Sequence, residues 1–355
     1  MRKPHLFSVL AAGLTAVLSF NTQAAQKDSF SVCWTIYAGW MPWEYGAAEG
    51  IVDKWAKKYG IDIDVVQIND YVESINQYSA GQFDGCSMTN MDALTIPAAG
   101  GVDSTALIIG DFSNGNDGIV VKGEKKTLGD LKGQNVNLVE LSVSHYLLAR
   151  GLDKAGLSER DLKVVNTSDA DLVATFATSD VTSVVTWNPL LAEIEATPAV
   201  TKVFDSSQIP GEIIDLMVVN SDTLRDNPAF GKAMTGAWYE IMATMSADTP
   251  AGIAAREHMA KASGTDLAGY EAQLAATKMF YSAKDAVAFA KSPKLPATMS
   301  KVAAFSFSHG LLGEGAQSAD AIGMSFANDV VTGDKGNLKL RFEPTYMQMA
   351  ADGEL

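Results

Sequence analysis

Short apolar runs of strand length alternate with segments of helical periodicity through the first two thirds of the chain. The pattern predicts a strand at residues 31–37, a helix from residue 42, a strand at 61–68, a helix at 71–80 and a strand at 83–88. Pro42 suits the first turn of its helix, because the amide that proline lacks would have no intrahelical partner there. Strands and helices that alternate in this way form βαβ units, so the sequence predicts an α/β fold.

A polar, glycine-rich stretch at residues 111–118 separates two apolar runs and is predicted to cross between two lobes. The alternation of strands and helices restarts after it and continues to an apolar strand at 212–219, which is predicted to return to the first lobe. From residue 227 the pattern is helical, and the last predicted helix lies at 319–326. A mature chain of roughly 330 residues exceeds what one hydrophobic core usually supports, which also favours two lobes.

The amino terminus has the pattern of a secretory signal peptide. Arg2 and Lys3 precede an apolar run at residues 6–20, and the small residues Ala24 and Ala25 offer a cleavage site. The apolar run is too short to span a membrane comfortably, so we expect a cleaved, soluble, monomeric protein in the periplasm. The expected organisation is a signal peptide at 1–25, the first part of lobe 1 at 26–112, lobe 2 at 113–213, and the return to lobe 1 with C-terminal helices at 214–355.

Composition and charge narrow the possible partners. The hydrophobic content of 47% is typical of a well-packed globular protein. Without Arg2 and Lys3 the chain keeps 25 basic against 42 acidic side chains, a formal charge of −17. Nucleic acid and anionic membrane surfaces are therefore poor candidate partners.

Cysteine and histidine are scarce. Cys33 and Cys86 lie in predicted strands of one sheet, and either a disulfide or two buried thiols is compatible with that position. His145, His258 and His309 remain after the signal peptide is removed, and they are predicted to be isolated from one another and from any cysteine cluster. The sequence therefore predicts no zinc site and no cofactor.

Aromatic and polar side chains gather where the predicted strands end, and in open α/β sheets ligands bind at the carboxyl ends of strands. The candidate ligand-binding residues are Trp40, Trp43, Glu44, Asn90, Asp92, Glu140, Ser142, Ser144, His145, Trp187, Asn188 and Asp215.

Simpler structural roles remain open for several of these residues. A tryptophan can pack beneath the sheet, and Ser142 or Ser144 can cap the helix that follows it. Glu140 can be a solvated loop carboxylate. Asp215 interrupts an apolar strand, so it must be hydrogen-bonded, paired or turned toward a ligand, because isolating a carboxylate from water is very costly.

Several segments resemble a family of ABC-transporter substrate-binding proteins for nitrate, aliphatic sulfonates, taurine and thiamine-precursor pyrimidines. The resemblance covers about residues 30–225 and rests on the aromatic turn after the first strand, TNMD at 89–92, TLGDLKGQNV at 127–136 and VTSVVTWNPLLAEIE at 181–195. The chain looks most like the subgroup encoded beside urea carboxylases, whose solute is taken as urea or guanidine. The resemblance implies a two-lobed, type II periplasmic binding protein, in which each lobe is a doubly wound, mostly parallel sheet flanked by helices.

The local chemistry favours a planar cation as the solute. The candidate segments contain four carboxylates and three tryptophans but no Arg or Lys. Guanidinium can stack on tryptophan while its N–H groups bond to carboxylates. Urea is planar but neutral and would leave the carboxylates without a counter-charge, and taurine, other sulfonates or nitrate suit an acidic site least.

The resemblance implies an ABC permease and ATPase as partners. The competing class is an enzyme of the thiamine-pyrimidine type, since a serine, a histidine and acids coexist near residues 140–145. Ser144 and His145 are consecutive at a predicted helix start, so their side chains diverge, and no nucleophile-elbow motif accompanies them. We therefore expect a binding protein with no catalytic residues. A sensory role, in which the closed state is passed to a membrane partner, is the third possibility.

Overall fold

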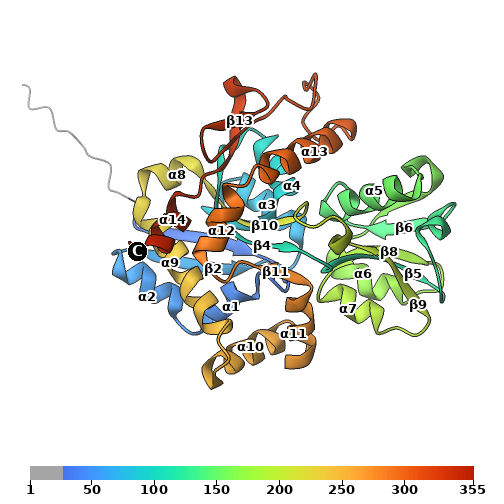
Figure 1. Ribbon diagram of the computed structural model, residues 1–355, viewed down its shortest axis with the longest axis horizontal. Coiled ribbons are helices and arrows are strands. Elements are labelled where there is room, and N and C mark those ends of the chain that lie inside the picture. The colour runs from blue at the N-terminus through green and yellow to red at the C-terminus, as the bar shows by residue number, and fades with distance from the viewer. Residues whose placement is uncertain (1–26) are drawn as a thin grey trace, which may run out of the picture.

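The structure is a computed structural model and describes residues 27–355. In these residues the chain forms two β-sheets, each flanked by helices, which build two lobes (Figure 1). The predicted signal peptide lies outside the described residues. Within residues 27–355, no helix combines the length and the apolar character that crossing a membrane requires.

The larger sheet belongs to lobe 1. Its strands are ordered β13-β12-β14-β4-β10-β3-β1-β2, and β11 pairs with β4. Their bounds are β1 Ser29–Trp34, β2 Asp62–Gln67, β3 Gly85–Thr89, β4 Ser104–Ser113, β10 Ile214–Asn220, β11 Thr277–Met279, β12 Gly323–Phe326, β13 Val330–Thr332 and β14 Leu338–Phe342.

Helices from both ends of the chain cover this sheet. The N-terminal set is α1 Met41–Ala48, α2 Ile51–Lys58, α3 Tyr71–Ser79, α4 Asn90–Ala93 and the π-helical turn η1 Leu94–Ala98. The C-terminal set is α8 Ser221–Asp226, α9 Pro228–Met245, α10 Pro250–Ala262, α11 Leu267–Ala275, α12 Ala283–Ala290, α13 Lys294–Ser308, η5 Lys335–Asn337 and α14 Thr345–Asp352.

The smaller sheet forms lobe 2, drawn in green in Figure 1, with the strand order β7-β6-β8-β5-β9. Its strands are β5 Asp117–Lys122, β6 Asn135–Leu138, β7 Lys163–Asn166, β8 Ser183–Trp187 and β9 Val200–Asp205. Its helices and short turns are η2 Leu128–Leu131, α5 Val143–Ala155, η3 Glu159–Asp161, α6 Asp169–Phe176, α7 Leu190–Glu195 and η4 Ser206–Gln208.

The predicted two-lobed α/β fold is confirmed, and both sheets are mixed rather than mostly parallel. In lobe 1, β10 runs antiparallel to both β3 and β4. In lobe 2, β5 runs antiparallel to both β8 and β9. The antiparallel pairs arise because β5 and β10 are the strands through which the chain enters one sheet directly from the other.

Two neighbouring segments connect the lobes, residues 114–116 between β4 and β5 and residues 206–213 between β9 and β10. The hydroxyl of Ser206 on the second segment lies 2.7 Å from that of Ser113 and accepts the backbone N–H of Gly115 at 2.7 Å. Gly115 has φ 120°, a conformation that side-chain-bearing residues rarely adopt. The two crossings therefore form one hydrogen-bonded hinge.

Two predicted helices differ in the structure. The helix that begins near Pro42 breaks after α1, because Gly50 takes the left-handed conformation with φ 66° and α2 starts in a new direction. The helix predicted at residues 319–326 is wrong, since Gly323–Phe326 forms strand β12. Long-range pairing with β14 decides its conformation, and Phe326 stacks on Phe342 with ring centroids 5.2 Å apart.

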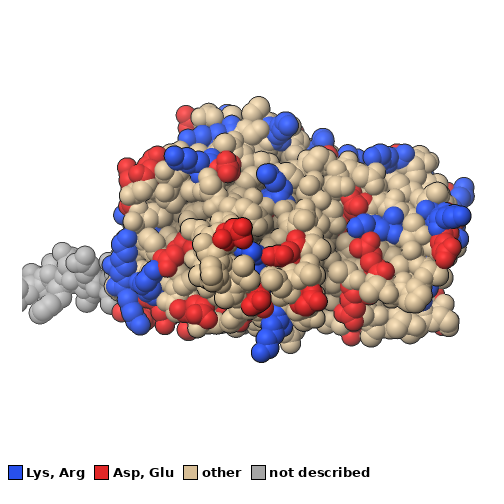
Figure 2. Space-filling model, turned by 60° about the horizontal axis from the view of Figure 1, so that its bottom comes forward, with Lys and Arg blue, Asp and Glu red and all other residues tan. Residues whose placement is uncertain are grey.

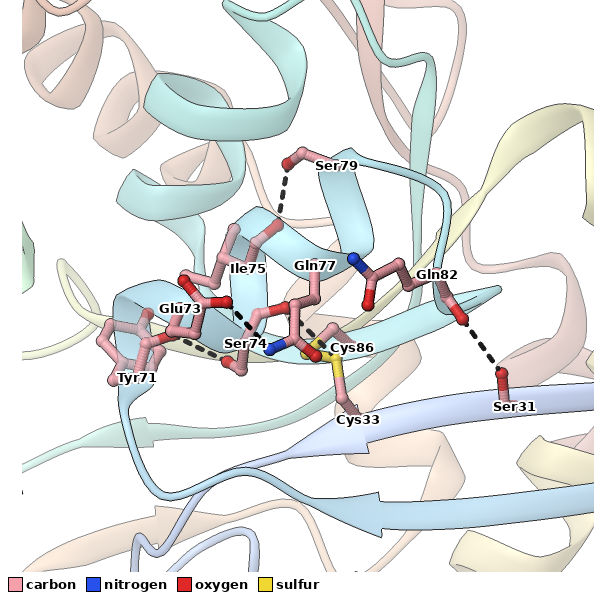
Figure 3. Close-up of a disulfide and its surroundings, with 10 residues drawn as sticks. All are labelled: Ser31, Cys33, Tyr71, Glu73, Ser74, Ile75, Gln77, Ser79, Gln82 and Cys86. Atoms are coloured by element: carbon pink, nitrogen blue, oxygen red, sulfur yellow. Dashed lines mark hydrogen bonds between the residues drawn. A yellow bond between two sulfur atoms is a disulfide. The ribbon is translucent and has the colours of Figure 1, made fainter.

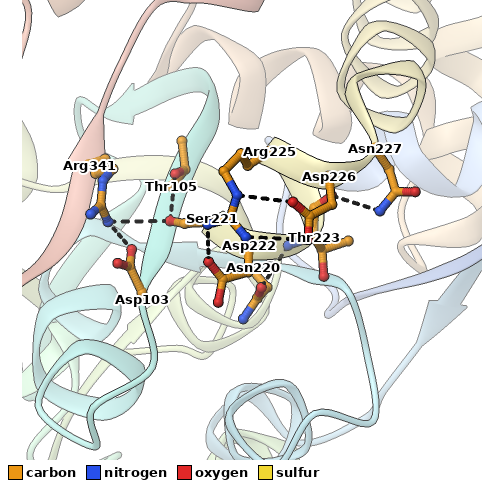
Figure 4. Close-up of polar contacts among 10 residues, drawn as sticks. All are labelled: Asp103, Thr105, Asn220, Ser221, Asp222, Thr223, Arg225, Asp226, Asn227 and Arg341. Atoms are coloured by element: carbon orange, nitrogen blue, oxygen red, sulfur yellow. Dashed lines mark hydrogen bonds and ion pairs between the residues drawn. The ribbon is translucent and has the colours of Figure 1, made fainter. Parts of the chain in front are cut away.

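The C-terminal strand β14 is tied to lobe 1 by polar contacts (Figure 4). Arg341 on β14 pairs with Asp103, which immediately precedes β4. Thr105 on β4 and Ser221 on α8 are linked by a hydroxyl–hydroxyl bond of 2.8 Å. These bonds hold the end of the sheet that is remote from lobe 2.

Cys33 and Cys86 form a disulfide, which decides between the two states that the sequence left open (Figure 3). The cysteines lie directly opposite one another on the parallel strands β1 and β3, with Cα atoms 4.4 Å apart. Both side chains are completely buried beneath α3. The disulfide joins two of the strands whose carboxyl ends reach the cleft between the lobes.

Candidate functional site

A small cavity lies between the lobes beside the hinge. It is lined by Tyr37, Trp40, Tyr71, Thr89, Asp117, Val143, Trp187, Ile213 and Asp215. Tyr37 and Trp40 come from the turn after β1, Thr89 from the end of β3 and Trp187 from the end of β8. The cavity volume is about 10 Å³, which is about the space that one water molecule needs, so the two lobes are closed tightly at this point.

Aromatic rings form the walls of the cavity. Tyr71 of lobe 1 meets Trp187 of lobe 2 edge to face, with ring centroids 5.5 Å apart. Trp40 lies 5.8 Å from Tyr71 and 5.0 Å from Tyr37, again measured between centroids. The four rings thus form a continuous wall, to which lobe 2 contributes Trp187.

Four aspartates lie in or directly behind this wall: Asp92, Asp111, Asp117 and Asp215, with exposed fractions of 0, 0, 3 and 2%. Burial raises the pKa of Asp92 to about 6 and those of Asp111 and Asp117 to about 7. Burial, and next the charge of Asp111, raises the pKa of Asp215 well above its usual range. Within residues 27–355 no Lys, Arg or His lines the cavity or pairs with any of these carboxylates.

The four aspartates are separate from the charge on the outer surface. Figure 2 shows acidic side chains over both lobes of one face, with basic side chains among them. Surface charges of both signs are screened by water and salt. The buried aspartates are not screened by water and salt in this way. The centre of the molecule therefore holds an acidic site that, among residues 27–355, has no basic side chain beside it.

Asp92 connects the acidic site to lobe 2. Its Oδ2 accepts hydrogen bonds from the Tyr71 hydroxyl at 2.7 Å and the Thr89 hydroxyl at 2.8 Å. These two bonds, with a smaller contribution from the nearby backbone N–H of Val143, oppose the effect of burial on the pKa of Asp92. Val143 is the first residue of α5, so the carboxylate occupies a helix N-terminus, where a bound anion would otherwise be favoured.

The structure brings four of the residues predicted from the sequence to the site. Trp40, Trp187 and Asp215 line the cavity, and Asp92 bonds to two of its lining residues. The remaining predicted residues lie elsewhere and have other contacts.

Three of these remaining residues belong to lobe 1. Trp43 is 1% exposed and packs on Trp238 of α9, with ring centroids 4.9 Å apart. Glu44 lies 2.9 Å from His258 of α10. The side chain of Asn90 bonds to the backbone of the strand that returns from the hinge, accepting the N–H of Ile214 at 3.0 Å.

The others lie in lobe 2. Glu140 is exposed, and Ser142 caps α5 by accepting the backbone N–H of Ser144 at 3.2 Å. Ser144 is buried without a hydrogen-bond partner for its hydroxyl. The side chain of Asn188 accepts the backbone N–H of Ala192 at 2.9 Å and so supports the start of α7.

His145 joins a cluster that the sequence did not predict. Its Nε2 lies 3.3 Å from a carboxylate oxygen of Glu159, whose other oxygen lies 2.7 Å from Nε2 of His309 on the opposite lobe. The prediction that the histidines are isolated from one another is therefore wrong for this pair. The three residues have the spacing of metal ligands.

The hydrogen bonding of His145 does not fit a metal ligand. Its Nδ1 accepts the backbone N–H of Leu141 at 3.1 Å, so the proton of the neutral ring is on Nε2, the atom that faces Glu159. A metal needs that nitrogen unprotonated. The hydrogen bond from His145, with a contribution from His309, lowers the pKa of Glu159 to about 2. The cluster is best described as a polar contact between lobe 2 and α13.

The candidate residues named from the sequence do not include Asp111, nor six of the residues that line the cavity: Tyr37, Tyr71, Thr89, Asp117, Val143 and Ile213. Asp111 and Asp117 lie at the two ends of the predicted crossing, where polar residues are expected for solvation alone. Asp111 lies beside Asp215 only through the pairing of β4 with β10, so no local sequence signal identifies it.

Comparison with known proteins gives a consistent family and fold. A family model described as NMT1/THI5 like matches residues 54–248. A protein of Brucella abortus (strain 2308) named "Putative binding protein BAB2_1146" is 25% identical over 181 residues, which cover 50% of this chain and 56% of that protein. This chain thus spans little more than half the length of the curated relatives that it matches.

Solved structures are similar over most of the chain. The alkanesulfonate-binding protein SsuA from Xanthomonas axonopodis pv. citri, bound to MOPS, has a TM-score of 0.67 and 17% identity, covering 82% of this chain and 96% of that one. The periplasmic aliphatic sulphonate binding protein SsuA from Escherichia coli has a TM-score of 0.66 and 19% identity, with 81% and 94% coverage. At these identities the similarity shows that the fold is that of periplasmic binding proteins.

Proposed function

Because the chain belongs to the NMT1/THI5-like family and has the fold of periplasmic binding proteins, we propose that it is the solute-binding component of an ABC importer in the periplasm. Its partners are the permease and the ATPase of that importer. Its solute is guanidinium, which the two lobes enclose in the cavity beside the hinge.

The uncompensated carboxylates of the cavity are the observation that carries this proposal. Asp117 and Asp215 line a space that no basic side chain in residues 27–355 approaches. Burying carboxylates without a counter-charge costs several kcal/mol each. A cation that enters the cavity removes that cost, so the folded protein gains free energy by binding one.

The shape of the cavity supports a small planar cation. Trp40, Tyr71 and Trp187 line the cavity, and a flat cation can stack on the face of an aromatic ring. Guanidinium also has N–H groups on all sides in one plane, which can bond to Asp117 and Asp215 together. Urea has a similar outline but no charge, so it does not compensate the carboxylates.

A sulfonate is the solute named for the similar solved structures, and it is the main alternative. Two features argue against it. The cavity offers no cationic side chain among the described residues, and Asp92 occupies the α5 N-terminus that would favour an anion. A sulfonate would therefore add a negative charge beside four aspartates.

The Brucella relative and both solved structures are named as binding proteins, in agreement with a role that is not enzymatic. Ser144 and His145 do not form a nucleophile–base pair, since His145 bonds to Leu141 through Nδ1 and faces Glu159 through Nε2. These contacts occupy the nitrogen atoms that a general base would need.

Isothermal titration calorimetry and thermal shift with guanidinium, urea, nitrate and taurine test the proposal. A solute that binds the folded protein raises its melting temperature, because it stabilises that state by RT ln(1 + [L]/Kd). We expect guanidinium to do so at concentrations far below those at which it denatures proteins. A larger shift with taurine, nitrate or urea would refute the assignment.

Two isosteric variants localise the effect. Asp117→Asn removes a carboxylate that lines the cavity and should weaken guanidinium binding by about 2 to 5 kcal/mol, the range for truncating a buried charge pair. Glu140→Gln makes the same chemical change at an exposed position outside the cavity and serves as the control. Equal affinity loss in both variants would place the ligand elsewhere.

A further inference from the structure

Asp111 and Asp215 lie directly opposite one another on the antiparallel strands β4 and β10. Both are almost completely buried, with 0 and 2% exposed. Oδ2 of each residue is buried and has no hydrogen-bond partner among residues 27–355. Two facing carboxyl groups that each lack a donor can satisfy one another only if one of them carries a proton.

No basic side chain among the described residues neutralises the negative charges of Asp111 and Asp215, so a proton shared by the pair is the way left to reduce them. The Tyr37 hydroxyl donates to Oδ1 of Asp111 at 3.2 Å. Oδ2 of Asp111 is packed against Gly39, where an added Cβ would lie only 2.5 Å from it. The only other charge that acts on the pair among the described residues is that of another acid, Asp117 on β5, and the charge of Asp111 in turn raises the pKa values of Tyr270 on α11 and of Tyr281.

We infer that Asp111 and Asp215 hold one proton between them and present a single negative charge to the cavity. Asp215 lines the cavity, whereas Asp111 lies behind it. Asp215 is thus the ligand-facing partner, and Asp111 is a positioning residue that bonds to it.

The electrostatics agree with this assignment. Burial raises the pKa of Asp111 to about 7, and burial followed by the charge of Asp111 raises the pKa of Asp215 well above its usual range. Like charges so close in a dry site cannot both ionise, as in carboxylate dyads generally. A shared proton removes the repulsion between two ionised carboxylates.

This inference rests on the proposed function and deepens it, because it assigns the number of charges that the pair of carboxyl groups presents to the bound cation. The charge of the pair then matches that of a single guanidinium group. Asp117 and Asp92 remain as separate acids of the site.

Infrared spectroscopy of the unliganded protein tests the inference without any ligand. At about pH 8 isolated aspartates are ionised, and we expect one protonated-carboxyl signal that Asp111→Asn and Asp215→Asn each remove. Asp117→Asn, which changes a cavity carboxylate outside the pair, should leave the signal in place. Absence of the signal in the wild type, or its persistence in both pair variants, would overturn the inference.

Guanidinium affinity provides the second readout. Asp111→Asn keeps a hydrogen-bond donor next to Asp215 and leaves the pair with one charge, so its Kd should stay within about threefold of the wild type. Asp215→Asn removes the charge that faces the cavity and should raise Kd by at least about thirtyfold. Equal losses in the two variants would contradict the positioning role of Asp111.

Two further results separate the shared proton from the folding of the variants and from the identity of the ligand. If Asp111→Asn does not fold, NMR of wild-type protein with carbon-13-labelled aspartate decides the question, since one carboxyl must keep a protonated shift at about pH 8. If guanidinium does not bind but the shared proton is observed, the proposed ligand is wrong and the inference about the pair stands.

Discussion

Tyr71 of lobe 1 and Trp187 of lobe 2 meet edge to face across the cleft, with ring centroids 5.5 Å apart. The Tyr71 hydroxyl also donates a hydrogen bond to Asp92, so the aromatic contact between the lobes is connected to the acidic site. The described state is therefore a closed one, in which cavity-lining side chains of both lobes are in contact.

Replacing Trp187 by Leu should weaken guanidinium binding. A desolvated cation–aromatic contact contributes about 2 kcal/mol, so we expect Kd to rise by roughly thirtyfold in calorimetry. Trp43→Leu is the matched control, because Trp43 packs on Trp238 inside lobe 1 and does not line the cavity. It should lower the melting temperature while the folded protein keeps its affinity. An unchanged Kd in Trp187→Leu would show that this ring does not contact the ligand.

Glu212 in the hinge segment connects the lobes through two basic side chains. Oε2 of Glu212 accepts a hydrogen bond from the Nε–H of Arg150 in lobe 2, and its Oε1 lies 2.8 Å from Nζ of Lys301 on α13. Burial raises its pKa, but hydrogen bonds from Arg150, Lys301 and Tyr146 outweigh burial and lower the pKa to about 2. Because the folded-state pKa is depressed, this contact stabilises the protein above the unfolded pKa and is lost only as the pH falls toward about 2.

Glu212→Gln should therefore shift the unliganded protein toward an open form. Small-angle scattering should give a larger radius of gyration, and Kd should rise modestly because only the closed fraction is competent to bind. Lys54→Met breaks an ion pair with Glu240 that lies wholly within lobe 1, so it should change neither quantity. Identical scattering profiles for Glu212→Gln and the wild type would contradict a role in closure.

The disulfide should contribute to stability and not to binding. Cys33 and Cys86 are separated by 53 residues, and closing a loop of that length in the unfolded chain is worth roughly 4 kcal/mol. The double variant with alanine at both positions should lose about this much in denaturant unfolding while its guanidinium affinity stays unchanged. A loss of affinity comparable to that of Asp117→Asn would show that β1 and β3 hold the site through this bond.

Some residues of the site could be predicted because burying their side chains costs free energy unless a partner or ligand compensates it. Asp215 interrupts an apolar strand, and the structure places it 2% exposed in the cavity wall. Trp40 and Trp43 show the limit of such reasoning. They are three residues apart and of one type, yet Trp40 precedes α1 and lines the cavity, whereas Trp43 on the first turn of α1 faces α9.

Other features depend on contacts between distant parts of the chain. Asp111 looks like a polar residue at the edge of a loop until the register of β4 on β10 places it opposite Asp215. His145 and His309 are brought together only by the contact of α13 with lobe 2. Glu140 follows a buried strand as expected, but the turn at Leu141, with φ 63°, leaves it exposed. Pairing and turn geometry of this kind cannot be read from local periodicity.

The affinity for guanidinium should fall in acid. Burial raises the pKa of Asp117 to about 7, and a cation binds the ionised form of this residue in preference. At about pH 5.5 roughly 3% of a group with that pKa is ionised, so Kd should be about thirtyfold higher than at about pH 8. Calorimetry across this range measures the change, and Asp117→Asn should remove the part of the pH dependence that this residue contributes, along with much of the affinity.

The stability of the unliganded protein should change in the opposite direction over the same range. The raised pKa of Asp117 means that the folded state binds more protons than the unfolded state between about pH 4 and pH 7. Its contribution to stability is therefore complete below the unfolded pKa and is lost as the pH rises through about 7. Guanidinium should restore that loss, so its thermal shift should be larger at about pH 8 than at about pH 5.5. A thermal shift that is independent of pH would mean that the ligand does not contact a titrating carboxylate in this cavity.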